Sequence, residues 1–189
     1  MKKFLYTLMV FLTGCSSIGM QDYGNIYPVG KVLTTSCVSI ISFNKRLRAS
    51  PQIYGDDTFV GYIDYGQHMP KGHVFLVLPL KTQPNTVGEL LIDADPRHRQ
   101  FWLEAQLLRG EISSNTVFEA RVPPIQKRTS PNAVIVEREA LFLRGEIHVS
   151  CGNRYLVAVQ ANPLVSESNE WEGIRESYAN FKSSLRWPE

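Results

Sequence analysis

The chain has 189 residues, of which 43% are hydrophobic and 20% are charged. This length and apolar content suffice for one domain with a substantial core. There are 20 Lys and Arg residues against 18 Asp and Glu residues, and leaving out Lys2 and Lys3 makes both counts 18. A chain without net charge lacks the general attraction by which basic proteins bind nucleic acid, so we expect no nucleic-acid partner.

The N-terminal segment has the order of a secretory signal. Lys2 and Lys3 precede nine largely apolar residues at 4–12, and Thr13 and Gly14 follow. Nine residues at about 1.5 Å each cover only about half of a ~30 Å hydrocarbon core, so the segment is too short to span a membrane. We therefore predict a signal peptide over residues 1–14.

The sequence Leu12-Thr13-Gly14-Cys15 resembles the lipobox of bacterial lipoproteins. The resemblance implies that Cys15 receives a diacylglycerol, that the chain is cut before it, and that the new N-terminus is acylated. Several acyl chains, at about 0.8 kcal/mol for each buried CH₂, give stable anchoring. Thr13 is less usual there than Ala or Ser, and the alternative is an ordinary signal peptide. Ser16, where an Asp would mark the inner membrane, implies the outer membrane of a two-membrane bacterium.

If Cys15 carries lipid, Cys37 and Cys151 remain as an even pair. In an oxidising compartment such a pair predicts a disulfide. The loop that it would close corresponds to about 4–5 kcal/mol of stabilisation in the chain-entropy treatment. The alternative is two separate buried thiols, because free cysteine packs as a small hydrophobic residue.

Residues 15–28 are predicted to be the lipidated cysteine and a short tether, because they are small and polar with two glycines. The thirteen residues 16–28 reach at most about 45 Å. A globular domain at 29–189 would therefore stay close to its membrane. Within it, the basic cluster NKRLR at 44–48 is interpreted as a solvated turn, with contact to an anion or a lipid headgroup as the alternative.

Most of the domain is predicted to be strand. The runs concerned are rich in β-branched and aromatic residues, and the one at 73–80 is almost wholly apolar, which is typical of a central strand. The predicted strands lie at 31–43, 58–65, 73–80, 116–122, 133–143, 146–151 and 154–160. Cys151, Gly152 and Asn153 separate the last two as turn residues, which predicts a β-hairpin.

Two main helices are predicted. The first lies within 96–109, where Pro96 suits the first helical position. The second covers 169–185, because its apolar residues recur at spacings of three and four, with charged residues opposite. Asn169 and Glu172 have the spacing of a capping pair at its start.

The predominance of strands, with a hairpin and a closing amphipathic helix at the end, predicts a single α+β domain. Its sheet would be mostly antiparallel, with the two helices packed on it. The order of elements over 73–187, which ends in YANFKSSLRW, is similar to that of PsbP/Mog1-like domains. That family has an antiparallel sheet between helices and usually binds partners instead of catalysing reactions, so the resemblance implies a binding function.

The sequence indicates neither a metal site nor a cofactor. Asp93, Asp95 and His98 lie at the predicted helix start, where capping and the helix dipole account for the carboxylates. His68 and His73 flank a loop that contains Pro and Gly, and a third ligand is not evident. A Gly-x-Ser-x-Gly nucleophile motif and an HExxH zinc motif are absent.

The pentapeptide LRGEI occurs at 108–112 and again at 143–147. Equivalent Arg and Glu residues in the two copies could form paired ion sites. The flanking elements differ, however, and the similarity does not extend to a full repeating unit. We therefore interpret the recurrence as chance.

Trp102 is a candidate contact for a partner. Phe101 and Trp102 are adjacent on the predicted helix, so they cannot both occupy the centre of one apolar face. One of them could be exposed as an anchor at an interface. Core packing is the alternative.

These observations predict a non-catalytic envelope lipoprotein, anchored by lipid at the outer membrane, that acts as an accessory or adaptor component of an envelope protein assembly. One alternative is a lipoprotein that binds a lipid or small ligand between the 73–80 strand and the closing helix. The other is an envelope hydrolase, which would require an acid and base within reach of each other in a cleft.

Overall fold

The computed structural model describes residues 25–34, 37–49, 58–64, 72–96, 99–130, 133–138, 140–161 and 167–188. Cys15 and the predicted signal peptide lie outside these residues. The described part contains three sheets, whose strand pairs are all antiparallel, and three helices. The α+β prediction is therefore confirmed. None of the described helices combines the length and apolarity needed to cross a membrane.

The largest sheet has eight strands, with the three longest side by side near its centre. Their order across the sheet is β1 (Asn25–Ile26), β4 (Arg48–Ala49), β5 (Phe59–Asp64), β6 (Gly72–Leu80), β12 (Asn153–Ala161), β11 (Leu141–Ser150), β8 (Phe118–Val122) and β7 (Gln106–Arg109). The run predicted as a central strand forms most of β6. The predicted hairpin is β11–β12, with Cys151 and Gly152 in its turn.

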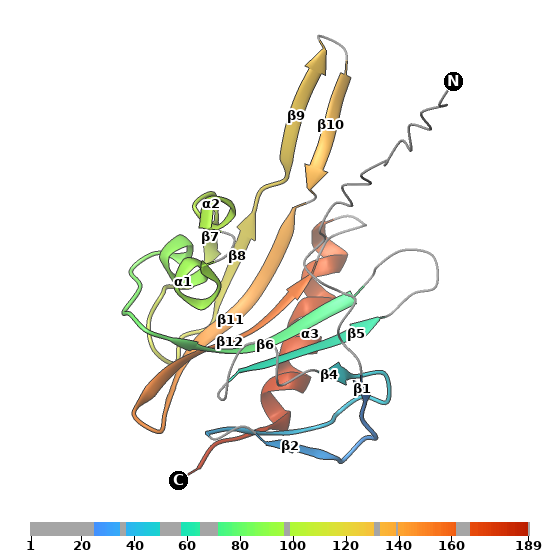
Figure 1. Ribbon diagram of the computed structural model, residues 1–189, viewed down its shortest axis with the longest axis vertical. Coiled ribbons are helices and arrows are strands. Elements are labelled where there is room, and N and C mark those ends of the chain that lie inside the picture. Colours follow the sequence, from blue (N-terminus) through green and yellow to red (C-terminus); the bar gives the residue numbers. More distant parts are fainter. Residues whose placement is uncertain are drawn as a thin grey trace, which may run out of the picture.

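The two smaller sheets lie at opposite ends of the molecule (Figure 1). One has the order β13 (Leu185–Arg186), β3 (Ser39–Ile41) and β2 (Val32–Thr34), close to β1 and β4. The other is a projecting hairpin of β9 (Ile125–Ser130) and β10 (Ala133–Arg138).

The projecting hairpin corrects two predictions. The run at 133–143 is divided between β10 and β11, and β9 was not predicted. Pro123 and Pro124 separate β8 from β9. Because proline lacks the N–H that a ladder needs, the two strands belong to different sheets.

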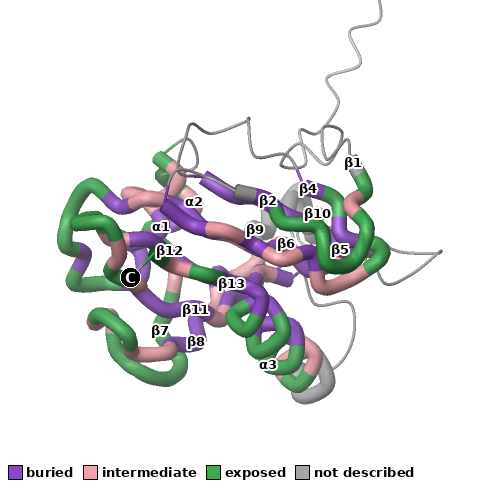
Figure 2. The backbone as a smooth tube through the Cα atoms, turned by 90° about the horizontal axis from the view of Figure 1, so that it is seen from below, coloured by how far each residue is buried: buried purple, intermediate pink, exposed green. Residues whose placement is uncertain are grey.

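The helices cover both faces of the large sheet. The long helix α3 (Glu167–Ser184) lies along one face, while α1 (Val87–Ala94) and α2 (Arg99–Trp102) lie against the other (Figure 1). Figure 2 shows buried residues on the side of α3 that faces the sheet and exposed residues on its outer side. The closing helix is therefore confirmed. It begins at Glu167, however, so Asn169 does not cap it.

Among the described residues of the first predicted helix, at 96–109, only Arg99–Trp102 is helical, as α2. A longer helix that was not predicted, α1, precedes it. Its N-terminal signal lies earlier, at Thr86, where the hydroxyl accepts a hydrogen bond from the Glu89 N–H and the Glu89 carboxylate accepts one from the Thr86 N–H. This capping box starts α1 at Val87, and Pro96 follows the helix instead of opening it. Residues 106–109 form strand β7.

Two apolar cores lie on opposite faces of the sheet. The core beneath α3 contains large, fully buried side chains from both the sheet and the helix, among them Phe59, Phe75, Tyr155 and Phe181. The core beneath α1 and α2 contains Leu90, Trp102, Phe118, Leu143 and Leu156. Alternate residues of β11 and β12 enter the two cores, as expected for strands covered on both faces.

The sheet begins within the predicted tether. Asn25 and Ile26 pair with Ala49 and Arg48 as β1, although both fall within 15–28. The small and polar composition of that segment did not indicate this pairing, which is provided by β4.

Candidate functional site

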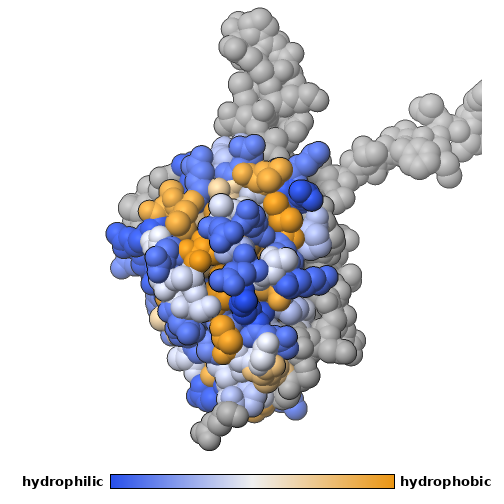
Figure 3. Space-filling view, turned by 90° about the vertical axis from the view of Figure 1, so that its left-hand side faces the viewer, coloured by the Kyte–Doolittle hydropathy of each residue, from blue (hydrophilic) through white to orange (hydrophobic). Residues whose placement is uncertain are grey.

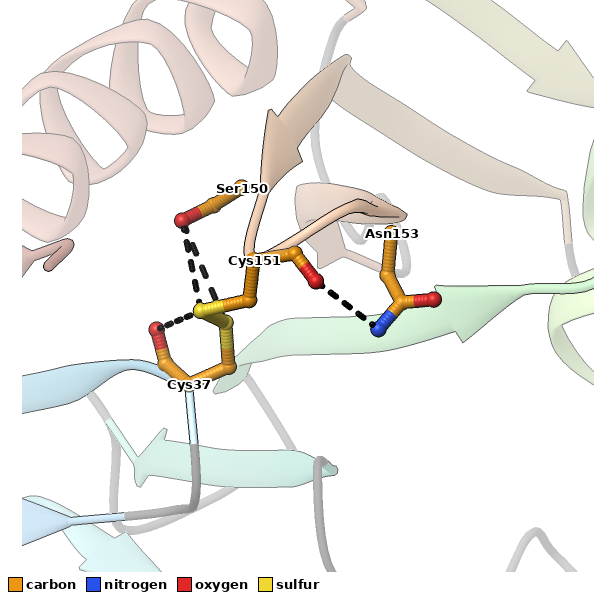
Figure 4. Close-up of a disulfide and its surroundings, with 4 residues drawn as sticks. All are labelled: Cys37, Ser150, Cys151 and Asn153. Carbon is orange, nitrogen blue, oxygen red and sulfur yellow. Dashed lines mark hydrogen bonds between the residues drawn. A yellow bond between two sulfur atoms is a disulfide. The ribbon is translucent and has the colours of Figure 1, made fainter. Parts of the chain in front are cut away.

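The two cysteines that were predicted to pair are joined by a disulfide (Figure 4). Cys37 follows β2 and is buried, and Cys151 is the first residue of the β11–β12 turn. Cys151 and Gly152 have φ of 51° and 73°, and two successive positive φ values are typical of the type I′ turn that suits a two-residue hairpin. The bridge therefore fastens the small sheet that contains β2 to the central hairpin.

Trp102 is not a surface contact. Its side chain is 4% exposed, and its indole N–H donates to the Asp95 carbonyl oxygen at 2.9 Å. Phe101 packs edge-on against it, with ring centroids 4.5 Å apart. Because α2 is short and turns this ring under α1, the proposed contact residue belongs to the core.

The exposed apolar residues of this region come directly after Trp102. Leu103, Leu107 and Leu108 are all exposed, and all four residues of β7 are exposed. Figure 3, which faces this side of the molecule, shows hydrophobic patches separated by hydrophilic surface. We refer to these three leucines and β7 as the β7 edge.

The β7 edge lies at the end of the large sheet. It pairs with β8 on one side, and within the described residues no strand pairs with its other side. Its register shifts between Leu107 and Arg109, and Gly110, with φ of 80°, ends it at a point where a Cβ would collide with the Val117 carbonyl. An open edge of this kind has unpaired backbone donors and acceptors that can accept a strand from another protein.

Charged side chains lie between α3 and the outer strands of the sheet. Glu119 on β8 is 4% exposed and accepts two hydrogen bonds from Arg175 of α3, from Nε at 2.7 Å and from Nη2 at 2.8 Å. Arg144 on β11 also donates to it. The hydrogen bonds from Arg175, which outweigh the effect of burial, hold the pKa of Glu119 below its ordinary value of 4.5.

A second buried carboxylate lies farther along β11. Glu146 is 2% exposed and accepts a hydrogen bond from Lys182 Nζ of α3 at 2.5 Å. His148 Nδ1 lies 3.9 Å from Glu146, and its ring stacks on Trp187 at 4.1 Å. Burial lowers the pKa of His148 below 6.5 despite this carboxylate. Burial, and secondarily Glu146, raises the pKa of Tyr178.

This charged cluster fastens α3 to the sheet. Each buried carboxylate is bonded to at least one cation of α3, and the pKa of Glu119 is lowered, whereas a general acid needs a raised pKa. Sequence analysis missed the cluster, although Arg144, Glu146 and His148 recur at every second residue of an otherwise apolar run. That spacing predicts one charged face on a strand.

The two LRGEI copies occupy different positions. Arg144 and Glu146 of the second copy belong to the charged cluster. Arg109 of the first copy lies opposite Glu119 across β7 and β8, and Glu111 accepts a hydrogen bond from Ser113 at 2.9 Å. The copies are not equivalent sites.

Two serines stand in sequences or contacts that nucleophilic catalysis could use. Ser42 and Lys45 have the order Ser-x-x-Lys, but Ser42 is buried and its hydroxyl donates to the Tyr27 carbonyl at 3.2 Å, while Lys45 is exposed. Ser177 Oγ lies 2.6 Å from His73 Nδ1, with both side chains buried between α3 and β6. These contacts hold elements together, and burial keeps the hydroxyls from a substrate.

The other candidate ligands are dispersed or structural. Asp93 accepts hydrogen bonds from the N–H groups of Lys81 and Thr82 at 2.8 and 2.9 Å, which tie α1 to the end of β6. His68 and His98 lie outside the described residues. Among the residues that are described, His, Cys, Asp and Glu do not gather in a group of three that could hold a metal ion.

No protein-family model and no curated protein matches the chain. The resemblances to lipoproteins and to PsbP/Mog1-like domains therefore stay predictions. What the chain does has to be inferred from its own residues, chiefly those of the N-terminal segment and the β7 edge.

Proposed function

We propose that the chain is a lipoprotein of a bacterial envelope, anchored at the outer membrane by lipid on Cys15. Its domain acts without catalysis, as an accessory or adaptor component of an envelope protein assembly. The proposed lipid anchor rests on the sequence Leu12-Thr13-Gly14-Cys15, which follows a segment with the order of a secretory signal. The disulfide between Cys37 and Cys151 supports an oxidising compartment, where such bridges persist.

The β7 edge supports action through protein contacts. It combines an outermost strand, whose outer backbone groups have no strand partner among the described residues, with three exposed leucines, and exposed apolar side chains that gather in this way can mark a protein-contact surface. Addition of a partner strand would pair these groups, and Leu107 and Leu108 would supply apolar contacts.

The alternatives receive less support from the described residues. The ligand-binding function requires space between β6 and α3, but aromatic rings fill that region, with Phe181 5.2 Å from Phe75 and 5.9 Å from Phe59. The hydrolase function requires an accessible acid and base. The buried carboxylates are instead bonded to cations, and the Ser177–His73 pair is buried.

Mass spectrometry of the mature protein tests the anchor. The expected mass is that of residues 15–189 with a diacylglycerol and an additional acyl chain, and Cys15→Ser should abolish acylation. A mature chain that is cut elsewhere and carries no acyl group would contradict the proposal.

Site-specific photo-crosslinking in intact cells tests the partner. A benzophenone side chain at Leu108, which is 51% exposed, should form a defined adduct with an envelope protein. The matched control is Val149 on β11, which is 49% exposed and lies away from the edge. The same adduct from both positions, or none from Leu108, would contradict the use of the β7 edge.

A further inference from the structure

A second surface combines exposed apolar side chains with basic ones. Ile26, Val29 and Val32 are exposed large hydrophobic residues within the first described segment of the chain. Ile26 lies directly opposite the exposed Arg48 in the β1–β4 pair. Lys45 and Arg46, which shortly precede Arg48 in the chain, are also exposed. We call these six residues the N-terminal face.

The backbone holds the N-terminal face together. The Tyr27 N–H donates to the Leu47 carbonyl at 3.3 Å, and the Ser42 N–H donates to the Lys31 carbonyl at 2.8 Å. The segments that carry the apolar and basic residues therefore run side by side. Leu33 and Leu47 point into the core beneath α3, so the residues that alternate with them point outward.

The charge of this region differs from that of the rest of the chain. Residues 23–55 contain two lysines, two arginines and no acidic residue. The other residues after Cys15 then have 14 basic and 18 acidic side chains, since the totals there are 18 of each. Residues 23–55 thus have a net positive charge because they lack acidic residues, and a segment with that charge complements an anionic surface.

The position of the proposed anchor selects the occupant of the N-terminal face. β1 begins at Asn25, ten residues after Cys15, and ten residues span at most about 36 Å. The face therefore lies on the part of the described domain that is nearest in the chain to the lipid. Figure 1 shows β1, β2 and β4 at one end of the molecule and the β9–β10 hairpin at the other.

Resting on the proposed lipid anchor, we propose that the N-terminal face lies on the anionic headgroup surface of the anchoring membrane. Lys45, Arg46 and Arg48 contact lipid phosphates, while the exposed apolar side chains enter the boundary between headgroups and acyl chains. The lipid supplies attachment, and the face supplies orientation. The β9–β10 hairpin then points away from the membrane.

Tryptophan quenching in vesicles tests this contact. The acylated protein is reconstituted in vesicles of phosphatidylglycerol and dibrominated phosphatidylcholine, with Val29→Trp as the probe and the parent protein as background. We expect the probe to be quenched relative to vesicles without bromine. Leu103→Trp is the matched control, because Val29 and Leu103 are both 61% exposed and Leu103 belongs to the β7 edge, outside the N-terminal face. Equal quenching at both positions, or none at Val29, would overturn the proposal.

Charge removal tests the anionic component. Each basic residue at an anionic surface changes the ratio of docked to undocked protein by about fivefold. Lys45→Ala combined with Arg46→Ala should therefore lower that ratio about 25-fold and reduce the quenching of the Val29→Trp probe. Vesicles of phosphatidylcholine alone should have a similar effect. Quenching that is unchanged in both cases would overturn the role of the basic residues.

The outcomes separate this inference from the proposed anchor. The same preparation is weighed by mass spectrometry and sedimented with the vesicles. Acylated, vesicle-bound protein without quenching at Val29 overturns the membrane contact and leaves the anchor standing. Protein without acyl chains overturns the anchor on which the inference rests. Crosslinking of the N-terminal face to a protein instead of lipid would also overturn the inference.

Discussion

The two sides of α3 contact the sheet by different means. On one side, Ile174, Tyr178 and Phe181 pack into the aromatic core over β5, β6 and β12. On the other, Arg175 and Lys182 bond to buried carboxylates of β8 and β11. Each group recurs at three, four or seven residues, so the apolar and charged stripes run next to each other along the helix.

The difference separates stability from position. Apolar contacts contribute most of the free energy of burial, but they are non-directional and tolerate small rotations. A two-point bond between Arg175 and Glu119 is directional, so it fixes the rotation of α3 on the sheet. We therefore expect the apolar side to dominate the free energy of unfolding and the charged side to dominate its pH dependence.

The largest expected effect comes from the apolar side. Phe181→Ala should lower the free energy of unfolding by about 3–5 kcal/mol, because it removes a fully buried ring and leaves a cavity. Urea denaturation with the disulfide intact measures this. Asn180→Ala, at an exposed neighbour on the same helix, is the control and should have little effect. A loss for Phe181→Ala no larger than the control would show that α3 does not depend on its apolar side.

A smaller effect is expected from the charged side. Glu119→Gln keeps the shape of the side chain but weakens its bonds to Arg144 and Arg175, so we expect a loss of about 1–3 kcal/mol. Arg175→Met keeps an apolar stem and removes the charge. A double-mutant cycle with both substitutions should give a favourable coupling of about 0.5–3 kcal/mol. Additive losses would mean that the direct interaction between Glu119 and Arg175 contributes nothing to the free energy of unfolding.

Acid should weaken the charged side selectively. Because the folded pKa of Glu119 lies below 4.5, its contribution is fully present above that pH and is lost as pH falls through the lowered folded pKa. The difference in unfolding free energy between the parent and Glu119→Gln should therefore shrink below about pH 4.5. A series of urea denaturations over pH measures it. A difference that grows on acidification would show that the pKa of Glu119 is raised in the folded protein and not lowered.

The smallest expected effect is local. The folded pKa of His148 is lowered below 6.5, so the folded protein binds fewer protons there, and stability falls as pH decreases from 6.5 to the folded value. Lys182→Met removes a cation that opposes protonation of His148 and that donates a hydrogen bond to Glu146. The titration midpoint of His148, measured by NMR, should therefore rise. An unchanged or lower midpoint would mean that Lys182 does not contribute to the lowered pKa of His148.

The parts of the fold that were predicted correctly have strong local patterns. The β11–β12 hairpin follows from turn residues between two apolar runs, and α3 follows from its apolar spacing. Of the helix predicted at 96–109, only the short α2 was found, and the longer α1 was missed because Pro96 was taken as a helix start. Thr86 and Glu89, which form the capping box, would have placed it correctly. The β9 strand was missed because Pro123 and Pro124 indicated the end of a strand, and no new strand was predicted directly after them.

The sites were less predictable, because they depend on residues that are distant in sequence. The disulfide could be predicted by elimination once Cys15 was assigned to lipid. The bonds from α3 to Glu119 could not, since they join residues 56 positions apart. The exposure of β7 depends on its place at the end of the sheet. Because residues 106–109 were predicted to be helical, this exposed strand was not expected.

The disulfide also has a consequence for the order of events during biogenesis. Cys151 is 114 residues after Cys37, in the last quarter of the chain. For a lipoprotein exported from its N-terminus, the second thiol emerges long after the signal peptide and the lipidation site. If the chain is exported as proposed, covalent closure of the domain follows translocation of most of the chain. In the reducing interior the same chain stays unclosed and remains easier to keep in an export-competent state.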